Sequence, residues 1–205
     1  MKEPPPTNQQ NPQAALEQIR HRLKVATREY SSGKLNAVQF NAIYRHYMEK
    51  REIIEKLLEL NPDSDAWKAA ASPGTTSYLK DRFEARPLYY VVFRKGDKKP
   101  LLGNGKVPKK AAEQIFKILQ VFWKMETWQS GLARKSIGDG MWMMLMVGEH
   151  SLTIAIYFLQ PSTIQQNRLR DLHSDFERAN RQALDRGFPP SRMVFPQRAI
   201  LNTKS

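Results

Sequence analysis

The stretch Gly103-Asn104-Gly105-Lys106 has the composition of a phosphate-binding loop. It stands before an expected helix, where free backbone amides and a lysine favour anions. A nucleotide-binding loop of the Walker type, however, has glycine where this chain has Pro100, and serine or threonine where it has Val107. We therefore interpret the stretch as a tight connection between two elements and expect no nucleotide site there.

The histidines and carboxylates show no pattern of a catalytic or metal site. The histidines lack the spacing of metal ligands, and Glu149-His150 falls at an expected turn, where both side chains should be solvated. The absence of cysteine excludes thiol catalysis, disulfide bonds and cysteine-bound metals. Without a nucleophile elbow or paired carboxylates, we expect no enzymatic activity, no metal and no cofactor. The four histidines are His21, His46, His150 and His173.

Basic residues concentrate in one short segment, residues 94–110, which is the most specific functional feature of the sequence. The formal net charge is +13, of which this segment contributes six charges and the residues after Asp185 four more, while residues 111–185 balance. We predict that the segment forms a basic hairpin that binds an anionic partner. Its basic residues are Arg94, Lys95, Lys98, Lys99, Lys106, Lys109 and Lys110.

Three kinds of anionic partner suit such a hairpin: an acidic protein surface, an anionic lipid or a nucleic acid. Nucleic-acid binding usually adds arginine and exposed aromatic rings, whereas this hairpin is mainly lysine, with no aromatic residue between Phe93 and Phe116. We favour an acidic protein and keep nucleic acid or anionic lipid as the second hypothesis. A third interpretation is a solvated lysine edge that prevents aggregation between sheets.

The composition predicts a folded, soluble and cytoplasmic protein. The chain is 40% apolar and 10% aromatic, which is enough to build a core. It opens Met1-Lys2-Glu3-Pro4, without a basic and then apolar leader, so we do not expect secretion. The most apolar stretch, residues 141–160, is interrupted by Gly148-Glu149-His150, which argues against a membrane helix.

The first part of the chain predicts a helical hairpin. Residues 1–12 are rich in proline, glutamine and asparagine and should form a disordered arm. Apolar residues at helical spacing then predict two helices over residues 13–60. Asn36 and Gln39 have the spacing of a capping box at the start of the second helix. Residues 61–86 read as a linker, in which 78–83 could form a short helix.

The second part, residues 87–187, predicts an α+β domain. Runs of β-forming residues predict strands over 88–93, 100–102, 132–137, 141–147 and 151–159. Helical spacing predicts a central helix over 108–128 and a last helix over 162–186, followed by a basic tail over 188–205. This order favours one antiparallel five-stranded sheet with helices packed on it.

The central helix is apolar on two sides. Ala112, Ile115, Leu119 and Phe122 should cover the sheet, and a second stripe lies on another side of the helix. We predict that this stripe binds a second copy of the domain, although the helical hairpin of the same chain could cover it instead. The stripe consists of Ala111, Ile118, Val121, Met125 and Trp128.

From Leu88 to Arg186 the chain resembles the roadblock/dynein light chain family, within the wider profilin-like and longin-like group. The resemblance rests on Ala111-Ala112 at the start of the central helix, on the turn Ile137-Gly138-Asp139-Gly140, and on a last helix that directly follows an apolar strand. It implies a roadblock-like fold that dimerises through the central helix and the neighbouring strand. It also implies a scaffold or regulator of Ras-like small GTPases, without catalytic residues. The helical hairpin, the basic hairpin and the tail are additions to the family's usual form.

These observations lead to one functional hypothesis and one alternative. The first is a non-catalytic scaffold or regulatory protein that forms a homodimer or heterodimer and docks an acidic protein, which the resemblance suggests is a small GTPase. The alternative is a basic protein that binds nucleic acid or an anionic membrane surface through the lysine-rich hairpin and the tail.

Overall fold

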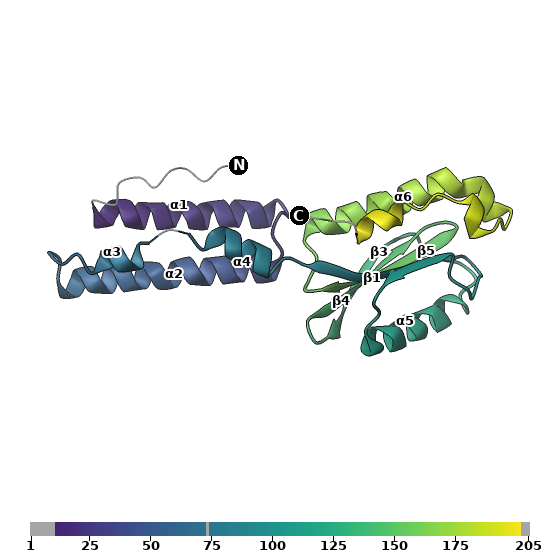
Figure 1. Cartoon of the computed structure of the whole chain (residues 1–205), viewed down its shortest axis with the longest axis horizontal. Helices are drawn as coiled ribbons and strands as arrows, with labels where there is room; N and C mark the ends of the chain where they lie inside the picture. Colours follow the sequence, from purple (N-terminus) through teal and green to yellow (C-terminus); the bar gives the residue numbers. More distant parts are fainter. Residues whose placement is uncertain (1–10, 73, 202–205) are drawn as a thin grey trace. The chain divides into compact units, whose positions relative to one another are not determined.

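The computed structural model describes residues 11–72 and 74–201 and divides the chain into two compact units, residues 1–84 and 85–205. Within the described residues, it has six α-helices and one five-stranded antiparallel sheet, so the α+β class is confirmed (Figure 1). Residues 1–10 of the expected disordered arm lie outside the described residues. Asn11 and Pro12, the last residues of that expected arm, are instead the N-cap and the first residue of a helix.

Two long helices, α1 (Pro12–Ser31) and α2 (Ala37–Leu60), form the hairpin of unit 1. The side chain of Asn36 accepts a hydrogen bond from the Gln39 amide at 2.8 Å, and the Gln39 side chain accepts one from the Asn36 amide at 2.9 Å. The predicted capping box is therefore confirmed. Gly33 takes a φ of 73° in the turn between the helices, a left-handed conformation that glycine adopts without strain.

The linker prediction for residues 61–86 is wrong for most of the segment. The short helix expected over 78–83 is present as α4 (Thr76–Arg82), but the segment also contains α3 (Trp67–Ala70), and unit 1 extends to Glu84. Trp67 is buried in the hairpin core with Ile43 and Ile54. Side-chain amides of the capping box also hold the segment, because Gln39 donates to the Lys80 carbonyl and Asn36 to the Phe83 carbonyl. The segment is part of the helical unit.

Unit 2 contains the sheet, with the strand order β2-β1-β5-β4-β3 and antiparallel pairing throughout. The long strands are at or within two residues of their predicted positions, whereas β2 begins two residues later than the predicted strand over 100–102. The strands are β1 (Arg86–Arg94), β2 (Leu102–Gly105), β3 (Gly131–Gly138), β4 (Met141–Val147) and β5 (Ser151–Phe158).

Helices cover both faces of this sheet. Helix α5 (Lys109–Phe122) lies on one face and α6 (Thr163–Asp185) on the other (Figure 1). Alternate residues of β4 point to opposite faces, so Met143 belongs to the core under α5 and Met144 to the core under α6. Helix α5 ends six residues before the predicted end at Trp128.

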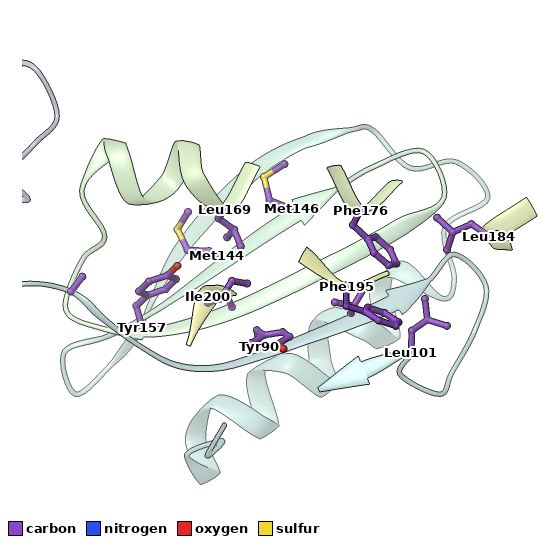
Figure 2. Close-up of a cluster of buried hydrophobic side chains, with 13 residues drawn as sticks. Tyr90, Leu101, Met144, Met146, Tyr157, Leu169, Phe176, Leu184, Phe195 and Ile200 are labelled. Atoms are coloured by element: carbon purple, nitrogen blue, oxygen red, sulfur yellow. The ribbon is translucent and has the colours of Figure 1, made fainter. Parts of the chain in front are cut away.

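The predicted basic tail is also part of the fold, as far as the structure describes it. Two short 3-10 helices, η1 (Pro190–Arg192) and η2 (Pro196–Ile200), follow α6. Phe195 stacks on Phe176 of α6 with ring centroids 5.3 Å apart, and Ile200 is 4% exposed in the same core (Figure 2). Asn180 fixes the segment by accepting from the Val194 amide and donating to the Val194 carbonyl. Residues 188–201 therefore complete the α6 face of the sheet.

A buried polar cluster lies beneath this segment. Nδ1 of His173 lies 2.8 Å from the Thr153 hydroxyl, and the side-chain nitrogen of Gln197 lies 3.5 Å from the same hydroxyl. Glu177 is the nearest charge, with a carboxylate oxygen 3.9 Å from Nε2 of His173. Burial lowers the pKa of the His173 imidazole below its usual value of 6.5, and the Glu177 carboxylate opposes this effect.

We predict that acid destabilises unit 2 through His173. The pKa of His173 is lower in the folded chain than in the unfolded chain. Below about pH 6.5 the unfolded chain therefore binds a proton that the folded chain does not, so the free energy of unfolding decreases as the pH is lowered. Proton NMR should give a titration midpoint for His173 below 6.5, the usual pKa of an imidazole. Urea unfolding should show a smaller loss at acidic pH in His173→Gln than in the control His21→Gln. A His173 midpoint at or above 6.5 would contradict this prediction.

Candidate docking surfaces

Helix α5 is held on the sheet by one apolar face. Ala111, Ile115 and Leu119 are buried there, and Ile118 and Phe122 are half-buried beside them. The prediction was wrong about the start of this face, because Ala111 lies against the sheet with no exposed surface and Ala112 faces outward. Ala111 therefore has no surface to offer a second copy.

The outer face of α5 and its C-terminal extension expose large apolar side chains. Phe116 is 55% exposed, Val121 58% and Met125 44%. Val121 and Met125 belong to the stripe predicted from the sequence, whereas Phe116 was not recognised. Lys117 and Lys124 are exposed close to them in sequence. Exposed large apolar side chains on and just after a charged helix are suited to a surface that binds another protein.

The chain after α5 folds back on the helix end. Trp128 is half-buried, packs edge-on against Phe122 with centroids 5.1 Å apart, and donates to the Phe122 carbonyl. Trp123 donates to the Asp97 carbonyl at 3.2 Å, which joins the β1–β2 loop to the end of α5. Trp128 is therefore committed mainly to its own domain, and its predicted place in a dimer contact stays a prediction.

The fold separates the seven basic hairpin residues into two groups. Arg94, Lys95, Lys98 and Lys99 lie at the loop between β1 and β2, near the end of α5. Lys106, Lys109 and Lys110 lie at the other end of the helix, beside the β3–β4 turn that contains Asp139. A helix of 14 residues is about 20 Å long. The predicted basic hairpin is thus two cationic sites at opposite ends of α5.

Three of the seven cations already have partners in the fold. Arg94 has 15% of its side chain exposed and donates to the Phe188 carbonyl. Lys110 lies 2.6 Å from the Asp139 carboxylate, a hydrogen bond that raises the pKa of the lysine. Lys95 stands over the Trp128 ring, 5.7 Å from its centroid. Lys98, Lys99, Lys106 and Lys109 are exposed and form no ion pair within the described part of the chain.

The residues of the loop-like stretch before α5 form a strand edge. Gly103, Asn104 and Gly105 pair with β1, opposite Val91, Tyr90 and Tyr89. At Gly105 the backbone has a φ of 96°, and a side-chain carbon there would stand 2.2 Å from the Leu88 carbonyl oxygen. Close approach of two strands therefore explains this glycine, and the stretch connects two elements as predicted.

Two carboxylates organise the turn between β4 and β5, where the sequence indicated only solvated side chains. Glu177 of α6 accepts hydrogen bonds from the amides of Glu149 and His150 and from the Ser151 hydroxyl. His150 is half-buried, with Nδ1 3.1 Å from the Asp185 carboxylate, so the expectation that it is solvated was wrong. Glu149 is exposed as expected.

No protein-family model, curated protein or solved structure matches this chain. Among residues 11–72 and 74–201, histidine, aspartate and glutamate side chains form no group that could hold a metal ion. Over the same residues, no helix combines the length and the hydropathy needed to cross a membrane.

We predict that Gly105→Ala destabilises unit 2 more than Gly96→Ala does. Both glycines have a positive φ, but a methyl group at Gly96 meets open space, whereas at Gly105 it meets β1 backbone. The strain of the positive φ, about 1 kcal/mol, is common to both variants, and only Gly105→Ala must also separate the strands. Urea unfolding of the two variants measures the difference. Equal losses would mean that β2 can move away from β1 at little cost.

Proposed function

We propose that this protein is a non-catalytic scaffold or regulatory protein of the cytoplasm, which dimerises through α5 and docks an acidic protein partner. The observation that carries the proposal is the exposed apolar side chains of α5 and of the residues just after it, where Phe116, Val121 and Met125 are 44–58% exposed. Burial of such side chains against another protein is favourable by about 25 cal/mol for each Å² of apolar surface removed from water.

The free edge of the sheet supports the same contact. Strand β3 is the last strand beside β4, so one of its edges has no partner strand among residues 11–72 and 74–201. Most residues of β3 are exposed, and α5 contacts this strand. A second copy could pair its own β3 there and continue the sheet, while the two α5 helices pack together. Arg134 and Lys135 on this strand oppose the approach of a like-charged copy.

The unpaired lysines supply the second part of the proposal. Lys98 and Lys99 at one end of α5, and Lys106 and Lys109 at the other, would attract and orient an acidic surface. The resemblance to the roadblock/dynein light chain family makes the partner more specific, because members of that family serve Ras-like small GTPases. A small GTPase is therefore the partner that we would test first.

We predict that Val121→Glu converts a dimer into a monomer. A carboxylate introduced into an apolar contact must lose its hydration on association, which should weaken association about a hundredfold or more. Size-exclusion chromatography with light scattering on the full chain measures the change. Because Lys117 and Lys124 lie close in sequence to the apolar side chains and would repel those of a second copy, association of the unmodified chain should tighten as salt rises.

Ile164→Glu is the matched control for this variant. Ile164 is 49% exposed and lies on α6, on the other face of the sheet, so its substitution should leave the dimer intact. A monomeric unmodified chain at high protein concentration would overturn the dimer.

Exposed lysines also suit the alternative, in which the two cationic sites bind nucleic acid or an anionic membrane surface. We predict that replacement of Lys98, Lys99, Lys106 and Lys109 by glutamine removes an acidic protein partner in affinity capture followed by mass spectrometry. The variant should remain dimeric, because none of the four lysines belongs to the exposed apolar residues Phe116, Val121 and Met125. Binding of labelled DNA or RNA that survives moderate salt, and is lost in the same variant, would instead favour the alternative.

A further inference from the structure

The two faces of unit 2 carry different cations. From residue 161 to residue 201 the chain contains arginine but no lysine, whereas the segment around β2 and the start of α5 is rich in lysine. Arginine presents a planar fork of donors that matches a carboxylate, while lysine is a strongly hydrated point charge. The arginines of this part are Arg168, Arg170, Arg178, Arg181, Arg186, Arg192 and Arg198.

Three of these arginines surround one hollow. It has a volume of about 640 Å³ and lies between the second half of α6 and the segment that follows the helix. Ligand sites in proteins commonly have volumes of about 300–1,000 Å³. The hollow is lined by Arg178, Ala179, Asn180, Arg181, Gln182, Ala183, Phe188 and Arg192.

Two sides of this hollow are fixed by the fold. Arg192 stands over the Phe188 ring, 5.3 Å from its centroid. Phe188 is itself held, because its amide donates to the Ala183 carbonyl at 2.8 Å and its carbonyl accepts from Arg94. Arg178 forms an ion pair with Asp175 one turn earlier on α6. Guanidinium groups held in this way lose less freedom when they bind a ligand.

The acidic residues in the second half of α6 do not neutralise all the arginines of the hollow. Glu177 is occupied by the β4–β5 turn, Asp185 by His150 and Asp175 by Arg178. Arg181 and Arg192 are exposed and form no ion pair with any acidic residue that the structure describes. The hollow therefore combines at least two guanidinium groups that are free to bind an anion.

We propose that this arginine-lined hollow binds an acidic peptide segment of a protein partner, with carboxylates of the peptide on Arg181 and Arg192. The inference rests on the proposed docking of an acidic protein and places a further docking site on the α6 face. An exposed apolar side chain adjoins the hollow, since Val194 is 65% exposed and its backbone is held by Asn180. The favoured segment thus carries an apolar residue beside its acidic ones, and its carboxylates form paired hydrogen bonds with the guanidinium groups.

Fluorescence anisotropy with a labelled synthetic peptide of alternating glutamate and leucine tests the proposal on the full chain. The double variant Arg181→Gln, Arg192→Gln should weaken binding about tenfold or more, because charge-assisted hydrogen bonds are lost. The same peptide with glutamine in place of glutamate should bind neither protein. Since both arginines are exposed and only Arg192 gives up a contact within the fold, the one with the Phe188 ring, the variant should unfold at nearly the same urea concentration as the unmodified chain.

The control variant Arg170→Gln, Arg198→Gln removes the same charge from exposed positions outside the hollow and should change the affinity less than about threefold. Equal losses in the two arginine variants, or no saturable binding, would overturn the hollow as a site. If binding is lost only when Lys98, Lys99, Lys106 and Lys109 are replaced by glutamine, the peptide binds those lysines. The proposed function would then stand, but the hollow would not be a binding site. If single-stranded DNA displaces the labelled peptide at a lower concentration than the unlabelled peptide does, a peptide is the wrong occupant.

Discussion

The interior strands β4 and β5 are apolar on both sides, and much of unit 2 follows from the need to cover them. Met143 and Ile154 turn to one face of the sheet, and Met144 and Tyr157 to the other. Exposure of either face would leave a large apolar surface in water, so each needs its own layer. A single helix of 14 residues covers the first face, whereas a longer helix and the segment after it cover the second.

This difference in cover determines what each face offers to other molecules. On the first face, the short helix α5 must supply both the inner contact with the sheet and the outer surface, and that outer surface remains partly apolar. On the second face, α6 and residues 188–201 enclose their apolar side chains together and leave arginine-rich polar surface outside. The two faces therefore differ in the chemistry by which they can recognise a partner.

Local rules of sequence predicted the elements better than their surroundings. The capping box at Asn36 and Gln39, and the apolar run of β4, depend on neighbours in sequence and were confirmed. The packing of residues 61–84 and 188–201 depends on distant partners, such as the Gln39 amide on the Lys80 carbonyl and Asn180 on Val194. A polar, proline-containing segment has no periodic pattern from which such contacts could be predicted.

The candidate sites show the same limit in residue detail. The sequence placed exposed apolar residues on α5, but it assigned Ala111 to the wrong side, because one step along a helix turns a side chain by about 100°. It found the excess of lysine and could not find its division between two ends of a helix, which depends on the pairing of β1 with β2. The arginine-lined hollow depends on Phe188 and Arg192 folding back beside α6, a tertiary contact without a local signal.

The sheet order also constrains how the chain can mature during synthesis. Strand β1 lies between β2 and β5, so one of its two partner strands leaves the ribosome only when residues 151–158 have been made. Phe195 and Ile200 cover the α6 side of the sheet and are the last buried residues of this core to be synthesised. Unit 1 consists of contacts among residues that precede position 85 and can fold much earlier. A growing chain should therefore carry a folded helical unit followed by a sheet with an uncovered apolar face until residues 188–201 emerge.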